Sequence, residues 1–549
     1  MLRVIDVTKW RKDDEFGIFG IGARDKKILW SPIEPLENIK INYPYLFKES
    51  RDGCPDQFWM EIIAYIIGDS LKIDVPKAFP AIIKKDNGDV ICGALIEWFY
   101  DRKEETFVHA VDFFCKLIDG FDTKIGKQHN IVDVIKLCRV VSFKWGLKTK
   151  LEHWISNFVL FDSLIGNSDR HQENWGFVFR KVEKKEDGGW VLDVRLSPLY
   201  DNGTSLGHEK KTSKIACWGN FLIDNYLDNG FHHVRISREE PDCRLQHFEL
   251  VIAFAYHNAS YKQMFSEMLK FDLDTLKHKI YELCKLDIDI KLTPERAEWI
   301  IRLLTRRYQR ISLILNMRIL EKIIEPTRLL LTWQPPEGGS RFLVAIVRRD
   351  NENYQLEYQL DTLDFQRAVE KGFSGHPSFD LKQRIHTSNV LEPFLRRLPP
   401  KKRTDFAEYL EQHKLPFPFK FSDFALLGYT GAKSPADGFA FVIDLDGVSE
   451  DSEHILEVAG TRYLVNEGLD LSVVHIGERV QLQREPENLY DSNAIAIYHP
   501  KAGKLGYINK VLCTGLEFKV RKNKVSAFIL KKNGTEDRPL IYLLLEIEK

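Results

Sequence analysis

The stretch LIGNSDRHQENWGF, residues 164–177, places Asp169 five residues before Asn174. Transfer of a phosphoryl group requires little covalent chemistry from a protein. It requires an aspartate that orients a hydroxyl and accepts its proton, and oxygen ligands that hold Mg²⁺ on the phosphates. An Asp-x-x-x-x-Asn pattern supplies both kinds of group from one loop. The stretch therefore predicts a loop for phosphoryl transfer.

A second acidic motif, Asp201-Asn202-Gly203, follows the β-prone run VLDVRLSPLY (191–200). The catalytic loop of a protein kinase has an aspartate and an asparagine at the same spacing, and a metal-binding Asp-Phe-Gly motif lies further along the chain. In this sequence Arg170 and His171 follow the aspartate, whereas in the kinase pattern the His and Arg precede it. The ordered pair of motifs predicts a kinase more strongly than either motif does alone.

A lysine and a glutamate precede these motifs in the order that a kinase small lobe requires. The predicted strand YLFK ends at Lys48, and Glu61 follows 13 residues later on a helix predicted over DQFWMEIIAYIIGDSL (56–71). Apolar residues recur in that helix at i, i+4 and i+8. We therefore expect Lys48 to pair with Glu61 beside a nucleotide.

The segment GIGARDK, residues 20–26, is the predicted loop over the phosphates. Gly22 allows the backbone to approach a phosphate closely, and Arg24 and Lys26 supply positive charge. The loop contains no serine.

Each motif also has an ordinary structural explanation. Asp169 and Arg170 can form an ion pair within a loop, Asn174 can be a turn residue, and Asp201-Asn202-Gly203 can be a hairpin turn. The combination in one order favours the kinase interpretation.

The segment Asp169-Arg170-His171-Gln172-Glu173-Asn174-Trp175 resembles the catalytic loop of the HipA-like kinase family, and the resemblance covers roughly residues 1–320. It implies a bilobal protein-kinase fold that uses ATP and Mg²⁺. The implied site residues are Asp169 as the catalytic base, Asn174 and Asp201 as Mg²⁺ ligands, Lys48 on the α- and β-phosphates, and Glu97, Trp98 and Phe99 beside the adenine. Some family members autophosphorylate on a phosphate-loop serine, and this sequence departs from that pattern because its loop has none.

The pattern along the chain predicts an α+β fold. Residues 1–100 are rich in predicted strands, while residues 105–165 and 245–323 carry amphipathic helical patterns. After Pro326, TWQPPEGGS (332–340) predicts a linker, and a hairpin is predicted at 341–360.

The C-terminal region predicts a small β-barrel. The segments LEVAGTRYLV, VQLQREPENLYDSNAIAIYHP and GKLGYINK, within residues 456–545, resemble the HIRAN domain, which implies binding of single-stranded DNA, notably at a 3′ end. Carried over residue by residue, the implied DNA-binding residues are Arg462, Tyr463, Tyr490, Asp491 and Lys510. Residues 451–549 hold 14 acidic and 14 basic side chains, so binding would depend on a small pocket rather than on bulk charge.

These patterns together predict three domains: a kinase domain over residues 1–323, a small α/β module over 324–450, and a barrel over 451–549. The α/β module resembles the small N-terminal subdomain of HipA proteins.

Composition restricts the function classes. Lys plus Arg (79) and Asp plus Glu (80) almost cancel, so no whole-chain field attracts nucleic acid or a membrane. The eight cysteines show no metal-ligand spacing, and no apolar stretch is long enough to span a bilayer. We therefore expect a cytoplasmic protein with reduced thiols.

The predicted function is ATP- and Mg²⁺-dependent phosphorylation of a Ser or Thr of a protein, coupled to DNA binding at the C-terminus. The resemblance further implies a bacterial toxin-like or stress-regulatory role, with a small DNA-binding antitoxin as a partner. Two alternatives stay open: a kinase acting on a small molecule or lipid, and a catalytically silent scaffold whose function is DNA binding.

Overall fold

The computed structural model describes residues 3–14, 26–183, 190–237, 239, 242–434, 436–488, 491–535 and 538–549. Backbone packing divides the chain into two units. One contains Met1–Trp218 and Leu222–Leu315, and the other contains Gly219–Phe221 and Asn316–Lys549.

The first unit begins with a β-rich lobe built on a six-stranded sheet of order β1-β5-β6-β4-β3-β2. Its strands are β1 (Ile5–Asp6), β2 (Arg11–Lys12), β3 (Lys26–Trp30), β4 (Pro44–Glu49), β5 (Ala78–Lys84) and β6 (Val90–Glu97). Helix α1 (Phe58–Leu71) packs against β5 and β6 through its buried aromatic and aliphatic residues, and Lys72 ends it in the left-handed conformation. The predicted strand ending at Lys48 and the predicted helix are both confirmed.

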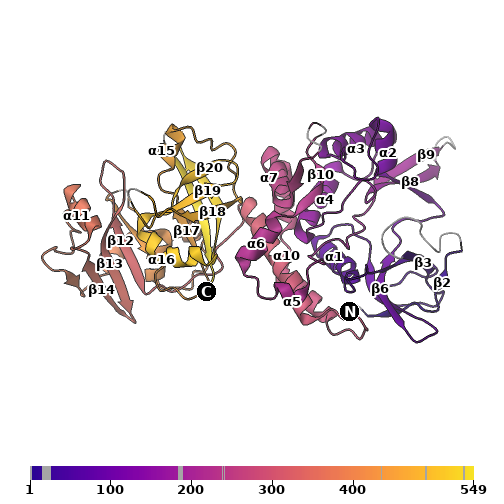
Figure 1. Cartoon of the computed structure of the whole chain (residues 1–549), viewed down its shortest axis with the longest axis horizontal. Coiled ribbons are helices and arrows are strands. Elements are labelled where there is room, and N and C mark those ends of the chain that lie inside the picture. The colour runs from indigo at the N-terminus through magenta and orange to yellow at the C-terminus, as the bar shows by residue number, and fades with distance from the viewer. Residues whose placement is uncertain are drawn as a thin grey trace. The chain divides into compact units, whose positions relative to one another are not determined.

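A helical lobe follows the β-rich lobe, and Figure 1 shows the two in indigo and in purple to magenta. Its helices are α2 (Ala110–Leu117), α3 (Ile131–Trp145), α4 (Leu151–Ile165), α5 (Thr212–Ile215), α6 (Asn220–Asp228), α7 (His247–His257), α8 (Ala259–Met268), α9 (Leu273–Leu283) and α10 (Pro294–Ile314). Its strands are β7 (Glu105–His109), β8 (Gly176–Glu183), β9 (Trp190–Leu196), β10 (Phe231–Arg235) and β11 (Arg244–Gln246).

The antiparallel pair β8 and β9 positions the two predicted catalytic motifs. Phe177 pairs with Leu196, and the amide of Ser197 donates to the carbonyl of Gly176 over 2.9 Å. The loop that precedes β8 and the segment that follows β9 therefore emerge at the same end of the hairpin.

The helical patterns predicted over 105–165 and 245–323 need two corrections. Residues 105–109 form strand β7, because they pair with β8 in register Glu105↔Arg180. The last helix of this unit, α10, ends at Ile314, and residues 315–323 are not helical. At 105–109 strand pairing overrides an amphipathic pattern that is compatible with a helix, and at 315–323 the backbone bonds elsewhere, with the amide of Leu320 donating to the carbonyl of Lys414 over 2.8 Å.

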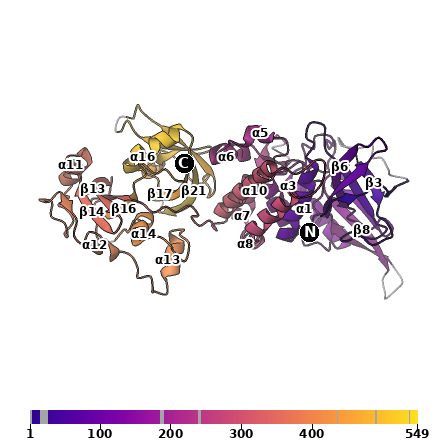
Figure 2. The same cartoon turned by 90° about the horizontal axis from the view of Figure 1, so that it is seen from below.

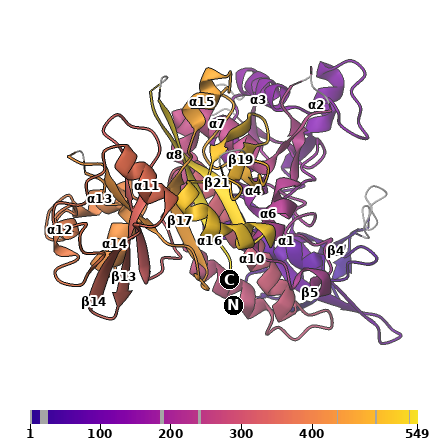
Figure 3. The same cartoon turned by 60° about the vertical axis from the view of Figure 1, so that its left-hand side comes forward.

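The second unit contains a five-stranded sheet of order β15-β14-β13-β12-β16. Its strands are β12 (Arg328–Trp333), β13 (Phe342–Asp350), β14 (Asn353–Tyr358), β15 (Ile385–His386) and β16 (Phe439–Ile443), and its helices are α11 (Leu363–Glu370), α12 (Glu392–Leu395), α13 (Phe406–Gln412) and α14 (Asp423–Thr430). Helix α11 packs on β13, and α14 packs on β16 (Figures 2 and 3). The hairpin predicted at 341–360 is confirmed. The linker predicted at 332–340 is wrong in its first residues, because Thr332 and Trp333 complete β12 and pair with β13 and β16.

A six-stranded sheet of order β17-β22-β21-β18-β19-β20 forms the C-terminal part of this unit. Its strands are β17 (Ser452–Glu457), β18 (Arg479–Arg484), β19 (Ile495–His499), β20 (Gly503–Tyr507), β21 (Val525–Gly534) and β22 (Pro539–Ile547). Just beyond β17, Ala459 exchanges two backbone hydrogen bonds with Tyr507 at the end of β20, which joins the two edges into the expected small barrel. Sequence analysis missed two helices here, α15 (Thr461–Asn466) and α16 (Lys510–Arg521).

The α+β class and the order β-rich lobe, helical lobe, α/β module and barrel are confirmed. One hydrophobic core contains residues of both sheets of the second unit, among them Leu331, Val347, Ile497 and Leu543. The predicted domain limits at 323/324 and 450/451 stay predictions.

Candidate active site

A buried ion-pair cluster joins the β-rich lobe to the segment after β9. The Nζ of Lys48 on β4 contacts Oε1 of Glu61 on α1 and Oδ1 of Asp201. Lys48 is 3% exposed and Glu61 is 4% exposed. The second oxygen of Glu61 accepts the amide of Asn202 over 2.9 Å. The expected pair is therefore present, and it includes the predicted metal ligand.

Asp201 has a backbone conformation that suits a loop carboxylate. Its φ of 57° lies in the left-handed region, which an aspartate tolerates better than most side chains. Its Oδ2 lies 3.9 Å from Nζ of Lys26. Gln57, just before α1, donates to the carbonyl of Gly203 over 3.0 Å. These contacts fix the Asp201 carboxylate between two lysines.

Helix α4 ends at Gly166, and the predicted catalytic loop follows directly. The side chain of Asn167 accepts the amide of Asp169 over 3.0 Å. The Nδ2 of Asn174 donates to the carbonyl of Asp169 over 2.7 Å, so its amide oxygen faces the other way. Asn174 and Asp201 thus supply an amide oxygen and a carboxylate, hard oxygen donors of the type that Mg²⁺ prefers, and the Asp201 carboxylate is paired with Lys48 in this structure.

Arg170 connects the two motifs from inside the lobe. It is fully buried, and its Nη2 lies 2.8 Å from Oδ1 of Asp162 on α4 and 2.6 Å from Oδ1 of Asn202. Its Nη1 donates to the carbonyl of Tyr200. Burial alone would raise the pKa of Asp162, but Arg170 and His232 outweigh it and hold that pKa below its usual value. The ion pair considered between Arg170 and Asp169 is therefore not the one formed, and sequence analysis missed Asp162.

The predicted adenine-side residues lie at the end of β6. Glu97 pairs with Lys40 over 2.8 Å. The carbonyls of Trp98 and Phe99 accept hydrogen bonds from the hydroxyl of Tyr43 over 3.1 Å and from Nη2 of Arg195 over 3.0 Å. The ring of Phe99 stacks on Tyr200 with centroids 5.0 Å apart. These interactions order the segment, and its contact with adenine stays a prediction.

The predicted phosphate loop falls mostly outside the residues that the structure describes. Gly22 and Arg24 lie outside the described residues. Lys26 is the first residue of β3 and pairs in register with Lys48 on β4. One of the three predicted phosphate-loop residues is thereby placed beside the ion-pair cluster.

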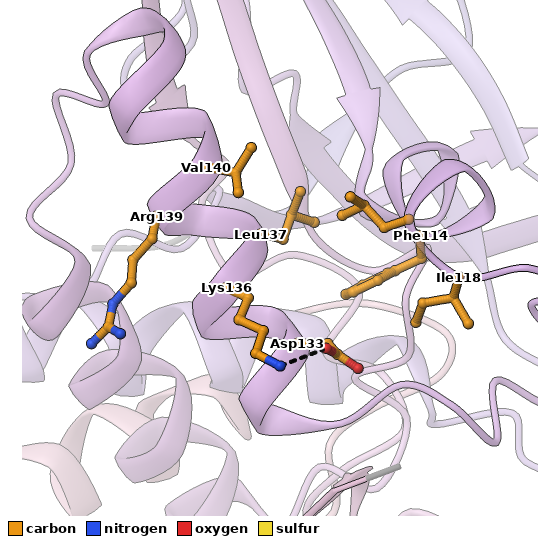
Figure 4. Close-up of a pocket in the computed structure, with 8 residues that line it drawn as sticks. Phe114, Ile118, Asp133, Lys136, Leu137, Arg139 and Val140 are labelled. Carbon is orange, nitrogen blue, oxygen red and sulfur yellow. Dashed lines mark ion pairs between the residues drawn. The ribbon is translucent and has the colours of Figure 1, made fainter.

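A separate shallow pocket lies on the helical lobe between α2 and α3 (Figure 4). Phe114, Ile118 and Leu137 line it together with exposed Lys136 and Arg139. None of the predicted site residues lines it. Within the described ranges no cluster of three or more His, Cys, Asp and Glu side chains is arranged to hold a metal. No described helix is long and apolar enough to cross a membrane.

Three of the predicted DNA-binding residues lie in α15 and in the connection between β18 and β19. The guanidinium of Arg462 lies over the ring of Tyr463, 4.6 Å from its centroid, and the tyrosine is 58% exposed. Asp491 accepts the amide of Asn493 over 3.0 Å. Residues 452–528 match the family model of the HIRAN domain.

This barrel contains a HIRAN domain.

Within the HIRAN domain, two of the five predicted DNA-binding residues need comment. Tyr490 lies outside the described residues. Lys510 begins α16 and pairs with Asp364 of α11 over 2.8 Å, so DNA would have to compete with an intramolecular carboxylate for it.

Sequence analysis missed a polar cluster of the HIRAN domain. The carboxylate of Glu485 accepts hydrogen bonds from Lys504 over 2.7 Å, from the hydroxyl of Tyr507 over 2.9 Å and from the hydroxyl of Tyr498 over 3.0 Å. Burial opposes ionisation, but these donors lower the pKa of Glu485 to about 2. The alternation of β19 and β20 would have placed the two tyrosines on neighbouring strands, but not their shared carboxylate.

Two solved structures similar to this chain are a kinase and a toxin-antitoxin complex. The Helicobacter pylori proinflammatory kinase CtkA matches with 17% identity and a TM-score of 0.41, over 55% of this chain and 94% of that chain. HipA of Shewanella oneidensis MR-1, solved with HipB and operator DNA, matches with 13% identity and a TM-score of 0.30, over 55% of this chain and 66% of that chain. No curated protein matches by sequence. Because these identities and TM-scores are low, we infer the function from the geometry of the site.

Proposed function

We propose that the first unit is a HipA-like protein kinase that transfers the γ-phosphoryl group of ATP to a Ser or Thr of a protein. The observation that carries this proposal is the buried cluster in which Lys48 contacts both Glu61 and Asp201. A lysine held by a helix carboxylate and placed against a loop aspartate is the arrangement that a kinase requires at the nucleotide phosphates. An ion pair with a purely structural role would require Lys48 and Glu61 but not the second carboxylate, that of Asp201.

The residues have separate roles in this reaction. Asp169, at the start of the loop, orients the acceptor hydroxyl and accepts its proton. Lys48 and Lys26 place positive charge where the nucleotide phosphates bind, and Glu61 keeps the Lys48 side chain extended toward them. Asn174 and Asp201 would hold Mg²⁺, whose chemical contribution is to neutralise charge on the phosphates.

Arg170 contributes to the reaction by positioning two segments of the site. Because it bonds Asp162, Asn202 and the carbonyl of Tyr200, it fixes the base-carrying loop relative to the metal-binding segment. A shift of about 1 Å between these segments would separate the base from the transferred group.

The HIRAN domain supports a second part of the proposal, binding of single-stranded DNA or of DNA 3′ ends. Exposed Tyr463 offers a ring for base stacking, and Arg462 offers a cation beside it. A bacterial, cytoplasmic, toxin-like or stress-regulatory role with a small antitoxin partner is part of the same proposal.

The test is transfer of ³²P from γ-labelled ATP with Mg²⁺ to the full chain itself and to proteins of a cell extract. Wild type is compared with Asp169→Ala and Asp201→Ala, and with Asp86→Ala as a control in an exposed turn. Labelled protein bands that vanish in the two site variants and persist in the control are expected. Label that enters only lipid or small molecules would favour the alternative kinase class.

Absence of both labelling and ATP binding would overturn the kinase proposal. The HIRAN domain would then be the basis of function, as in the DNA-binding scaffold alternative.

A further inference from the structure

An arginine outside the predicted motifs lies directly beside the catalytic loop. Arg244 begins β11, and its Nε donates to the carbonyl of His232 on β10 over 3.0 Å. Its Nη2 donates over 3.0 Å to the carbonyl of Ser168, the residue that precedes Asp169. Two of its five N–H groups are thereby used. Among the described residues no carboxylate forms an ion pair with Arg244.

The residues around Arg244 compensate little of its positive charge. Partial burial and the neighbouring Arg235 lower its pKa, whereas the Asp169 carboxylate opposes that change. The guanidinium stays charged because arginine has such a high intrinsic pKa. The carboxylate of Asp242 raises the pKa of Arg235, and it forms its own ion pair with Lys127 over 3.2 Å. Arg244 therefore presents positive charge near the catalytic base.

A chain of hydrogen bonds determines which ring nitrogen of His233, on β10, carries the proton. The indole N–H of Trp175 donates to Nε2 of His129 over 3.1 Å, so neutral His129 carries its proton on Nδ1. That Nδ1 lies 3.4 Å from Nδ1 of His233, which must then accept. Burial and the nearby arginines lower the pKa of His233 to about 3. His233 is thus neutral, with its proton on Nε2.

His171, in the catalytic loop, forms one group with Arg244 and His233. Its Nδ1 accepts the amide of Glu173 over 3.2 Å, so the neutral ring also carries its proton on Nε2. The rings of His171 and His233 are in edge contact, with centroids 5.8 Å apart. For neither Nε2 proton do the described residues provide an acceptor.

We propose that Arg244, His171 and His233 form an anion-binding subsite for an acidic group of the protein substrate, close to the phosphorylated Ser or Thr. The subsite rests on the proposed kinase function, because Asp169 marks where the acceptor hydroxyl must lie. One charged and two neutral N–H donors suit a carboxylate or a phosphate. The substrate class is therefore a Ser- or Thr-containing peptide with Asp, Glu or phosphoserine beside the acceptor.

The first arm of the test measures binding alone. Fluorescein-labelled serine peptides flanked by alanine, aspartate, phosphoserine or lysine are titrated with the full chain in the absence of ATP, and anisotropy gives Kd. Wild type should bind the acidic peptides about tenfold more tightly than the alanine peptide, and the gain should shrink at high salt. Comparison of the aspartate and phosphoserine peptides separates the two anion sources.

Arg244→Gln should abolish that gain, while Arg139→Gln, which removes an exposed arginine from α3, should keep it. Thermal unfolding of each variant checks that it is folded, and Arg244→Lys, which keeps the charge, should retain part of the preference. Equal binding of acidic and alanine peptides by wild type, or an unchanged preference in Arg244→Gln, would overturn the inference.

The second arm measures phosphorylation of the same peptides with ATP and Mg²⁺. An acidic preference in binding without any phosphoryl transfer would count against the kinase function and leave the subsite standing. Transfer without an acidic preference would count against the subsite and leave the kinase function standing.

Discussion

Lys48 and Glu61 are charged side chains with almost no exposure to water, a state that is costly unless each has a partner. The cluster satisfies this requirement, since Lys48 contacts two carboxylates and Glu61 also accepts a backbone amide. Buried ionisable groups that have such partners are common at functional sites, where their charge takes part in binding or catalysis.

Substitution Lys48→Ala should lower the rate of phosphoryl transfer at least about 100-fold, because a fixed positive charge at the phosphates is lost. Single-turnover transfer from labelled ATP measures this. Lys84→Ala, which removes an exposed lysine paired with Asp6, should leave the rate within about twofold. A similar loss in both variants would contradict a specific role for Lys48.

Substitution Arg170→Met should lower the free energy of unfolding by about 3–5 kcal/mol, because the fully buried Asp162 carboxylate would lose its guanidinium partner and keep only His232 and Asn167. The matched control is Arg180→Met, which breaks the exposed pair with Glu104 and should cost about 1 kcal/mol or less. Urea unfolding followed by circular dichroism measures both. Equal effects would refute the structural role assigned to Arg170.

Acid should weaken the first unit through His233. In the folded chain its pKa is about 3, whereas an unfolded histidine has a pKa of about 6.5, so between these values the unfolded state binds more protons. The free energy of unfolding should therefore fall as the pH drops from about 6.5 toward 3. His233→Asn should make this pH dependence shallower, and His278→Asn, at a 75% exposed site, should not. Urea unfolding at pH values from 4 to 7 supplies the slopes, and identical slopes would contradict the assignment.

At the scale of elements, the catalytic loop is held between the end of α4 and the start of β8. Gly176 is the first residue of β8, and a Cβ there would lie 2.2 Å from the carbonyl oxygen of Val108 on β7. Strand β7 therefore approaches the loop closely only because residue 176 is glycine.

Gly176→Ala should separate β7 from β8, destabilise the protein by about 2 kcal/mol or more and reduce phosphoryl transfer with it. Gly120→Ala provides a control: its φ of 67° costs about 1 kcal/mol, but no atom lies within 4 Å of the added Cβ. Thermal unfolding and transfer assays measure the pair. Retention of full activity by Gly176→Ala would show that the loop tolerates movement of β7.

At the scale of the whole molecule, the candidate kinase site and the candidate DNA site belong to different units. Arg462→Ala should weaken binding of a single-stranded oligonucleotide with a free 3′ hydroxyl about tenfold and leave ATP turnover without DNA unchanged. Asp169→Ala should abolish transfer and leave DNA affinity unchanged. Anisotropy with labelled DNA and a transfer assay on each full-length variant test this, and loss of both activities in either variant would contradict separable sites.

The local chemistry was predictable from sequence. The order and spacing of Lys48, Glu61, Asp169, Asn174 and Asp201 identify the candidate kinase site, because Asp169 and Asn174 share one loop and the other three follow the order that a kinase requires. Helix α1 followed from the periodicity of its apolar residues, and strand β4 and the hairpin at 341–360 followed from β-prone runs and turn signals.

Only the tertiary structure decided which distant residues meet. Lys48 contacts Asp201 across 153 positions, and the partner of Arg170 is Asp162 on α4 rather than the adjacent Asp169. The short strand β7 and helix α16 also depend on the sheets that they pack against. The sequence by itself determined the reactive groups and their local spacing. Packing of the hydrophobic cores decided their partners, because the burial of charge is settled only when distant segments exclude water together.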